Sequence, residues 1–315
     1  MHAWDREREI HNPELYAVWN GKPWLLNQAL LHLQTDSNAY DYAFWSDAGS
    51  FRDAHAFGAW PDPERVKEVF AAASRRRSQP EASRDGYMVF FPLMKPPGMG
   101  EHNWRVEKGP IDIDFSEGSF FGSTPSGIAW LAAAFYAIHD HYINTTPPPQ
   151  DQHHPHAPAT TPGTSRSPPF HFVGKDQTLF NTLMFRHPAR FFGVVSPVRA
   201  GQLPPSSGVA WISTLARTPP IPTIRVLLAK LVYKVKLYLG ERCVDDWYYY
   251  QWWLASPEGR RRTEKMRGWR RWRLGMLGGG EECTETGIVR VQWLLESIFG
   301  SRWVDNRMAK SNDPF

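Results

Sequence analysis

Carboxylate side chains beside turns are the residues of this sequence whose types and spacing best suit chemistry. Asp47 follows an aromatic run in "AFWSDAG", Glu117 opens the glycine-rich "EGSFFGS", and Asp176 lies in "GKDQTLFN". A carboxylate at a strand end suits a divalent cation that must meet a diphosphate, because Mg²⁺ or Mn²⁺ takes one or two protein carboxylates and leaves positions for phosphate oxygens. Taken alone, Asp47 is more often a turn residue that bonds its own backbone.

Glu117 and Asp176 also have structural alternatives. Gly118 and Gly122 let the backbone approach a ligand closely, yet the same pattern is typical of a bulge or hairpin. Asp176 suits the N-cap of the helix that follows it. The same helix N-terminus, with Lys175 beside it, favours phosphate. The residues by themselves leave both alternatives open.

Other motifs give weaker signals. The chain has no GxSxG nucleophile motif, and "GMLGGG" lacks the preceding strand and the spacing of a dinucleotide fingerprint. Asp112 and Asp114 in "IDID" are expected on one solvated face of an edge strand. The histidines of "HHPHAP" lie in a proline-rich insertion that offers no scaffold to fix metal ligands. None of these motifs predicts a specific reaction.

Charge and composition limit the partners. The net charge is +4 with a pI near 9, so the whole molecule is not an electrostatic magnet for nucleic acid. A basic run from Arg260 to Arg273 contains Trp269 and Trp272, which suit stacking on bases or contact with acidic headgroups. A solvated helix face is the commoner explanation of such a run. Nucleic acid is therefore not an expected partner.

The chain is long enough for one large domain. It has 315 residues, of which 42% are hydrophobic. Cys243 and Cys283 are too few for a disulfide scaffold, although they can form one bridge. The N-terminus does not resemble a signal peptide, and no apolar stretch is long enough to span a bilayer. The sequence as written predicts a soluble chain without a transmembrane segment.

The elements that must position the carboxylates follow an alternating pattern. A helix is expected to start near Pro23, with Trp24, Leu25 and Ala29 in its apolar stripe. "AYDYAFW" predicts a buried strand that ends at Asp47, and "DPERVKEVFAAASRRR" predicts the next helix. Helix, strand and acidic turn is the order by which an α/β sheet delivers a carboxylate to its C-terminal edge, where such folds bind ligands.

The middle of the chain continues this alternation. "YMVFFPLM" predicts a strand buried on both faces, "IDIDF" a strand or extended segment running into a glycine-rich loop, and "IAWLAAAFYAIHDHYIN" a helix. Residues 146–169 are of low complexity and are expected to be a disordered insertion. "FHFVGKDQTLFNTLMFR" then predicts strand, turn and helix, and "RFFGVVSP" another strand. A parallel or mixed α/β sheet flanked by helices is expected.

The predicted domains are residues 1–200, the α/β core, and residues 201–315, a mainly helical, aromatic and basic portion that packs on it. "VLLAKLVYKVKLYLG" and "VRVQWLLESIF" are the helix candidates at its two ends, and "DDWYYYQWWLA" is an aromatic block.

Five segments together resemble the HtrL/YibB-like family of bacteria and fungi, whose members look like glycosyltransferases of the GT-A fold. They are "HNPELYAVWNGKPWLLNQAL", "YDYAFWSDAGSFR", "FSEGSFFGS", "FVGKDQTLFN" and "DDWYYYQWWLA", and they span roughly residues 9 to 255. The resemblance implies a GT-A-like fold, a nucleotide-sugar donor, a glycan or other hydroxyl acceptor, and a divalent metal, Mn²⁺ or Mg²⁺.

The resemblance also implies roles for residues. "SDAG" is similar to a degenerate D-x-D motif, with Asp47 as the metal ligand and Gly49 where a second Asp would stand. Glu117 or Asp176 is the expected general base. The remaining donor and acceptor pocket is expected to comprise Lys22, Trp24, Gly49, Arg52, Gly118, Phe121, Gly122, Lys175, Gln177 and Trp252.

The resemblance carries one further expectation. GT-A folds open with a strand, a helix and further strands that hold the nucleotide base, whereas this chain starts at the helix just before the "DAG" strand. An N-terminally truncated fold is therefore expected, together with loss of the secretory-pathway or Golgi membrane anchor of a fungal-type member. The leading prediction is a glycosyltransferase, active or inactivated by truncation. The alternatives are a non-catalytic carbohydrate-binding relative and a basic protein that binds nucleic acid or membrane surfaces.

Overall fold

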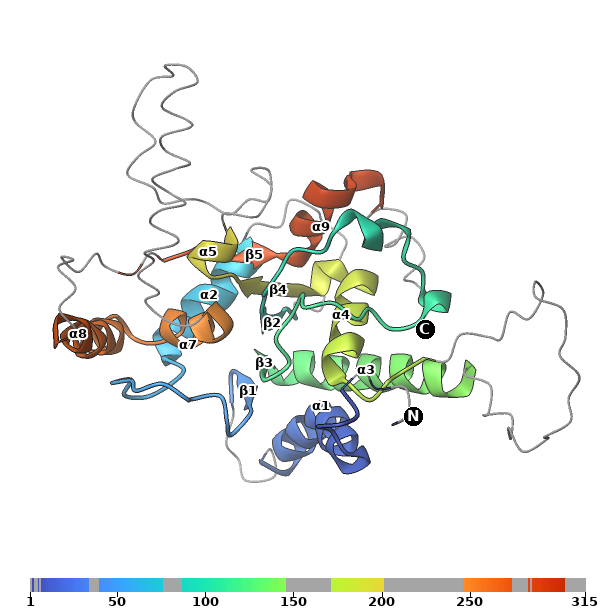
Figure 1. Ribbon diagram of the computed structural model, residues 1–315, viewed down its shortest axis with the longest axis horizontal. Coiled ribbons are helices and arrows are strands. Elements are labelled where there is room, and N and C mark those ends of the chain that lie inside the picture. The colour runs from blue at the N-terminus through green and yellow to red at the C-terminus, as the bar shows by residue number, and fades with distance from the viewer. Residues whose placement is uncertain are drawn as a thin grey trace, which may run out of the picture.

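A computed structural model describes residues 2, 5, 7–33, 40–75, 87–145, 171–200, 246–273, 283 and 285–303. Within these ranges the chain forms one mixed sheet flanked by helices, so the α/β class predicted from the sequence is confirmed (Figure 1). The expected disordered insertion at 146–169 and the helix expected at 226–240 lie outside the described residues.

The sheet has five strands in the described part of the chain, in the order β1-β3-β2-β4-β5. They are β1 (Ala43–Ser46), β2 (Val89–Pro92), β3 (Phe120–Ser123), β4 (Phe191–Val194) and β5 (Val289–Arg290). β3 is antiparallel to both β1 and β2, and β2 is parallel to β4, so β1, β2 and β4 point the same way. Their C-terminal ends therefore lie at one edge of the sheet.

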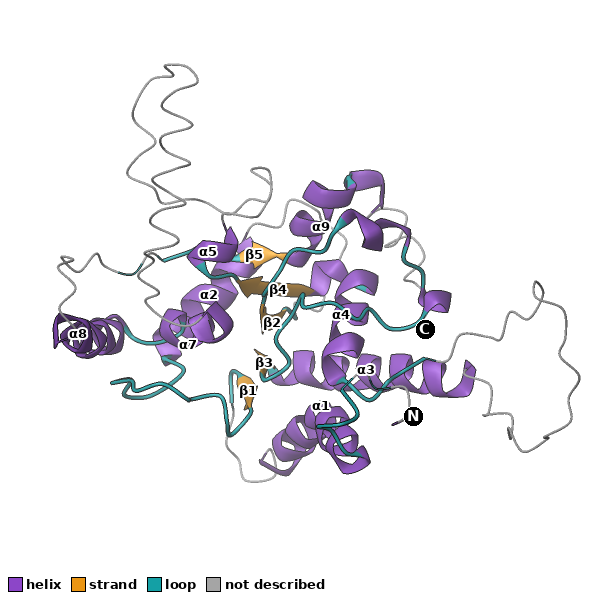
Figure 2. Ribbon diagram, viewed as in Figure 1, coloured by secondary structure: helices purple, strands orange, loops and turns teal. Residues whose placement is uncertain are grey.

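Helices cover both faces of the sheet (Figure 2). The α-helices are α1 (Pro13–Leu33), α2 (Pro63–Arg75), α3 (Pro125–Thr145), α4 (Asp176–Arg186), α5 (Pro197–Ala200), α7 (Tyr249–Trp253), α8 (Pro257–Arg273) and α9 (Val291–Phe299). Short 3₁₀ turns are η3 (Met99–Asn103), η4 (Val106–Lys108), η5 (Pro188–Arg190) and η6 (Asp246–Tyr248). The helices predicted at α2, α3 and α4 are confirmed.

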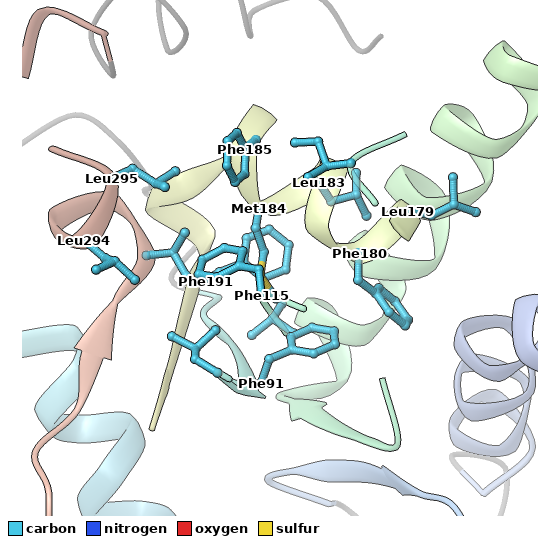
Figure 3. Close-up of a cluster of buried hydrophobic side chains, with 14 of the residues drawn as sticks. Phe91, Phe115, Leu179, Phe180, Leu183, Met184, Phe185, Phe191, Leu294 and Leu295 are labelled. Carbon is cyan, nitrogen blue, oxygen red and sulfur yellow. The ribbon is translucent and has the colours of Figure 1, made fainter. Parts of the chain in front are cut away.

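Alternation along the strands divides the buried side chains between two cores, because successive strand residues point to opposite faces. Phe91, Phe121 and Phe191 pack with residues of α3, α4 and α9, as the close-up in Figure 3 shows for Phe91 and Phe191. Phe90 and Phe120 pack on the other face with residues of α2 and α7. β2 is fully buried, which confirms the prediction of a strand covered on both faces.

The predicted start of the first helix is wrong. α1 begins at Pro13, where Asn12 caps it by accepting a 2.9 Å hydrogen bond from the Leu15 N–H, and Pro23 lies inside it. An Asn followed by Pro is itself a helix-start signal, because Asn suits the N-cap and Pro the first helical position. Tertiary packing offsets the cost of about 3 kcal/mol that an internal proline imposes.

The buried face of α1 also differs from the expected stripe. Lys22 and Pro23 are buried, whereas Trp24 and Leu25 lie exposed. The strand after this helix is half-buried, because β1 is the sheet's edge strand and has β3 as its neighbour on one side. Its expected full burial is therefore wrong.

The segment "IDID", expected to be a strand or an extended segment, is not a strand, and the strand of this region is β3, which begins at Phe120. Asn181 and Thr182 of α4 hold the backbone of residues 111–116: Asn181 Nδ2 donates to the Ile113 carbonyl at 2.7 Å, and Thr182 Oγ1 accepts from the Ile111 N–H at 3.0 Å. This stretch therefore makes a single β-bridge, between Ser116 and Leu93, outside the five strands of the sheet. The expected glycine loop instead contains β3.

Gly122 explains how a glycine-rich segment becomes a central strand. A Cβ there would stand 2.1 Å from the Phe44 ring and 2.7 Å from the Ala43 carbonyl oxygen. Glycine in a strand permits this close approach of neighbours. Another strand was expected at "FHFV", of which the structure describes residues 171–173, and these are irregular.

The C-terminal part of the chain joins the sheet. "VRVQWLLESIF", predicted as a helix, begins as β5, which pairs antiparallel with β4 before α9 starts at Val291. Cys283 is disulfide-bonded, and Cys243, the other cysteine of the chain, lies outside the described residues. None of the helices in the described ranges is long and apolar enough to cross a bilayer.

Candidate functional site

A buried lysine stands at the point where four segments meet. Lys22 of α1 places its Nζ 3.0 Å from Asp47 Oδ2 and 2.9 Å from Asp176 Oδ2, and donates to the Gly118 carbonyl oxygen at 3.1 Å. Its side chain is almost fully buried, at 4% exposure. Nζ donates hydrogen bonds to Asp47 Oδ2 and to the Gly118 carbonyl oxygen, whereas its contact with Asp176 Oδ2 is an ion pair without hydrogen-bond geometry. We call Lys22, Asp47, Glu117, Gly118 and Asp176 the acidic site.

Asp47 is held by both its backbone and its side chain. Its N–H donates to the Ser119 carbonyl at 2.8 Å, which fixes it at the end of β1, and its own carbonyl accepts from the Ser50 N–H at 3.0 Å. Trp45 Nε1 donates to Asp47 Oδ1 at 2.6 Å. The carboxylate is therefore oriented from two sides, while a third of the side chain stays exposed.

Glu117 is positioned at the end of β2. Its N–H donates to the Pro92 carbonyl at 3.0 Å, and its Oε1 accepts from the Ser119 N–H at 3.1 Å. The preceding residue, Ser116, is tied to α4 because its hydroxyl donates to Asn181 Oδ1 at 2.7 Å. Asn181, the last residue of "GKDQTLFN", thus fixes the segment that carries Glu117.

Asp176 is the first residue of α4, and Lys175 is its N-cap. The expectation of an N-cap at Asp176 is therefore one residue off, although Asp176 Oδ1 still accepts from the Gln177 N–H at 2.8 Å. Gly118 lies against this carboxylate: a Cβ at Gly118 would be 3.3 Å from both Asp176 oxygens. The glycine predicted to allow close approach approaches a carboxylate of the chain itself.

Burial and charge set the ionisation of the site. Burial disfavours the Lys22 ammonium, but the carboxylates of Asp176 and Asp47 outweigh it and raise the pKa of Lys22. Burial also raises the pKa of Glu117, against the hydrogen bonds from Ser119. The pKa of Asp176 is raised by burial and, less strongly, by the Asp47 charge, while Lys22 opposes the shift. The site therefore carries a fixed cation and a carboxyl group, Glu117, that is easier to protonate than usual.

The divalent cation implied by the resemblance does not fit this arrangement. The position between Asp47 and Asp176 holds the Lys22 ammonium, and Mg²⁺ needs oxygens at 2.0–2.1 Å around the position it takes. An ion bridging the two carboxylates would have to displace Nζ. A metal ion at Asp47 would therefore compete with the Lys22 ammonium for the same carboxylate.

A second group of possible ligands lies near the N-terminus. Ligand atoms of Asp5, Glu7 and His11 lie within 4.8 Å of one another. Each already has a protein partner: Asp5 Oδ2 is 2.7 Å from both His11 Nδ1 and the Tyr16 hydroxyl, and Glu7 pairs with Lys175. The group is a hydrogen-bonded cluster, and its ion pair with Lys175 connects the N-terminal segment to the start of α4.

Other predicted pocket residues surround the site without reaching its centre. Gln177 Nε2 donates to the Ser116 carbonyl and braces the Glu117 segment. Lys175, expected to meet phosphate, is paired with Glu7. Arg52 donates through Nε to the Gly49 carbonyl at 3.0 Å, beyond the Asp47 turn. Because of these contacts, neither Lys175 nor Arg52 reaches the carboxylates that surround Lys22.

The remaining predicted pocket residues lie elsewhere. Trp24 is on the exposed side of α1, at 51% exposure. Phe121 is fully buried in the core facing α3 and α4, and Gly122 is within β3. Trp252 is buried on the other face of the sheet and donates through Nε1 to Glu264 at 2.8 Å. The structure places Phe121 and Trp252 in hydrophobic cores.

Two residues that support the Asp47 turn were not predicted from the sequence. Trp45 donates to Asp47, and its signal was its position two residues before that carboxylate in "AFWSD". Gln251 Nε2 donates to the Ser50 carbonyl at 2.8 Å and connects α7 to the Asp47 turn. Its signal was a single polar residue in the aromatic block "DDWYYYQWWLA", because a buried amide in such a block needs partners.

The basic helix α8 makes ion pairs within the chain. Arg260 Nη1 is 2.8 Å from Glu285 Oε2 and its guanidinium lies over the Trp252 ring, 5.1 Å from the centroid. Arg262 pairs with Glu258 one turn away. Arg260 therefore packs against the core, whereas Arg262 lies on a solvated part of the helix.

The acidic site offers carboxylate oxygens for hydroxyl groups, a carboxyl group of raised pKa for proton transfer, and a fixed cation. No protein-family model, curated protein or solved structure matches the chain.

Proposed function

We propose that the chain is a glycosyltransferase with a GT-A-like fold, which moves a sugar from a nucleotide-sugar donor to a hydroxyl acceptor. The observation that supports this proposal is the convergence of Asp47, Glu117 and Asp176 at the edge where β1 and β2 end. Open α/β sheets bind ligands at the carboxyl ends of their parallel strands. The three carboxylates lie in three segments whose sequences resemble the HtrL/YibB-like family.

Glu117 is the proposed general base. A carboxylate whose pKa is raised toward neutrality is a stronger base when ionised, and Glu117 lies beside the exposed Asp47 turn through Ser119. It would take the proton of the acceptor hydroxyl as the acceptor oxygen bonds the anomeric carbon. The bond from that carbon to the diphosphate breaks, and the nucleoside diphosphate leaves. Asp47, the most exposed carboxylate of the site, would accept hydrogen bonds from sugar hydroxyls.

The charge of the site favours a second candidate, carbohydrate binding without transfer. The acidic site holds three carboxyl groups and one ammonium, so acidic groups are in excess around Lys22. An excess of carboxylates attracts hydroxyl donors and repels a diphosphate. A sugar therefore suits the site better than the diphosphate of a donor does, unless the donor brings its own counter-ion.

A direct assay separates the two candidates. The protein is incubated with a panel of nucleotide sugars and Mn²⁺, and donor hydrolysis or transfer is measured for the wild type, Glu117→Gln and Asp176→Asn. Asp114→Asn is the control, because Asp114 is exposed and pairs with Lys95 outside the site. Turnover that both site variants lose and the control keeps is the result expected of a transferase.

Calorimetry with free sugars tests the second candidate. Sugar binding that Asp47→Asn weakens, with no turnover of any donor, identifies a carbohydrate-binding protein. If there is neither turnover nor sugar binding, both candidates are wrong.

A further inference from the structure

Three oxygen atoms from three segments converge on one point of the acidic site. They are Asp47 Oδ2 after β1, the Gly118 carbonyl oxygen before β3, and Asp176 Oδ2 at the start of α4, at 2.9–3.1 Å from Lys22 Nζ. Carboxylate and carbonyl oxygens are the ligands that Mg²⁺ and Ca²⁺ prefer in proteins. These oxygen atoms therefore form a set of ligands suited to a cation, and the Lys22 ammonium occupies the position between them.

Lys22 is well fixed in this position. Its side chain is 4% exposed, and Pro23 beside it is also buried against the body of the protein. Burying an ammonium among carboxylates is favourable only when the ion pairs and hydrogen bonds replace its lost hydration. Lys95 shows the contrast: it pairs with Asp114 at 2.7 Å, but both side chains are about half exposed.

We propose that Lys22 is the resident cation of the acidic site, and that it takes the place of a divalent metal ion there. The identity of the ligand rests on the proposed function, whereas the identity of the cation does not. Lys22 is then a positioning residue: its ammonium holds the Asp47 and Asp176 carboxylates side by side, and ligand binding at the site needs no added metal. Removing the ammonium while leaving its space vacant exposes an oxygen cage that binds a divalent ion.

Two substitutions of the same lysine test this proposal. Lys22→Ala removes the charge and opens space for an ion with its water, whereas Lys22→Met removes the charge and fills the space. Mn²⁺ is the probe, because its binding can be followed by electron paramagnetic resonance of the free ion. We expect Lys22→Ala to bind Mn²⁺ roughly tenfold or more tightly than the wild type or Lys22→Met does.

The gained Mn²⁺ site must depend on the carboxylates. Adding Asp47→Asn to Lys22→Ala is expected to weaken Mn²⁺ binding by roughly tenfold or more, because it removes one of the two carboxylates among the three oxygen ligands. Asp114→Asn in the same background is the matched control and should leave binding unchanged, because Asp114 is exposed and pairs with Lys95.

Two outcomes overturn the proposal. One is Mn²⁺ binding by the wild-type protein that Asp47→Asn abolishes, because the metal would then bind beside Lys22 or displace it. The other is a folded Lys22→Ala variant that binds Mn²⁺ no better than Lys22→Met does. If Lys22→Ala folds only when Mn²⁺ is present, the metal has replaced the ammonium and the proposal is supported. If it folds under neither condition, the wild-type and Asp47→Asn titrations decide.

The experiment is independent of the proposed function. It uses the full chain and Mn²⁺ alone, with no sugar and no nucleotide, so a protein without transferase activity gives the same result. Conversely, transfer activity that requires Mn²⁺ bound at Asp47 would support the transferase and overturn the resident cation.

Discussion

Lys22 and Asp47, which are 25 positions apart in the chain, form an ion pair of 3.0 Å at the edge of the sheet where β1 ends. The other carboxylate oxygen of Asp47 accepts the Trp45 indole N–H at 2.6 Å. The Asp47 carbonyl accepts the Ser50 N–H, so the same residue also makes the turn. The turn is therefore part of the site, because it orients the Asp47 carboxylate toward Lys22.

Lys22→Met should destabilise the protein by about 3–5 kcal/mol, because removing one partner of a buried ion pair leaves uncompensated charge. Urea unfolding followed by circular dichroism measures the loss. Lys95→Met, in the exposed pair with Asp114, is the matched control and should change the free energy of unfolding by less than about 1 kcal/mol. Equal losses in the two variants would show that the buried Lys22 pairs add no more to stability than the exposed Lys95 pair does.

Gly118→Ala should destabilise the protein by about 1–3 kcal/mol, because the new Cβ stands 3.3 Å from both Asp176 oxygens and must push the carboxylate away. Gly49→Ala is the control, since a Cβ there meets nothing within 4 Å. It should be neutral or stabilise by about 0.4–1 kcal/mol. Thermal unfolding of both variants compares them, and a neutral Gly118→Ala would contradict the close packing of Gly118 on Asp176.

Glu117→Gln should stabilise the protein more at neutral pH than in acid. Burial raises the pKa of Glu117 above its ordinary value of 4.5, so the folded state holds this proton more tightly than the unfolded chain does. The stability that the group contributes is full below about pH 4.5 and is lost as the pH rises through the raised pKa. Glutamine stays neutral throughout and removes that loss.

Melting temperatures of the wild type and Glu117→Gln between about pH 4 and pH 7 check the sign. The advantage of the variant should grow as the pH rises. Glu14→Gln, on the exposed first turn of α1, provides a comparison outside the site. A difference that shrinks toward neutral pH would mean that Glu117 is stabilised as a carboxylate.

Trp45→Phe should lower the free energy of unfolding by about 1.5–3 kcal/mol, because the Asp47 carboxylate loses the hydrogen bond that the indole N–H donates to Oδ1. The ring stacked on Phe121 is largely retained, which isolates the effect of the N–H. Trp24→Phe, on the exposed side of α1, should change stability by less than about 0.5 kcal/mol. Chemical denaturation of the two variants side by side is the measurement.

Local patterns predicted most of the secondary structure. "YMVFFPLM", "IAWLAAAFYAIHDHYIN" and "GKDQTLFNTLMFR" gave β2, α3 and α4, because a continuous apolar run and a long alanine-rich segment each suit few structures. Two of the failures arise from tertiary contacts that a local pattern does not contain. "IDID" is not a strand because side chains of α4 take its backbone partners, and "EGSFFGS" becomes β3 because Gly122 admits Phe44.

The sequence by itself determined the α/β class and marked Asp47, Glu117 and Asp176 as carboxylates at turns, because helix periodicity, apolar strands and turn chemistry are local properties of the chain. Tertiary structure alone decided what these carboxylates meet. Lys22 lies on a helix whose predicted start was ten residues too late and whose apolar stripe was assigned to the wrong side. Its burial between Asp47 and Asp176 depends on how α1 and α4 dock at the edge of the sheet, and pairing across 25 and more residues leaves no local pattern.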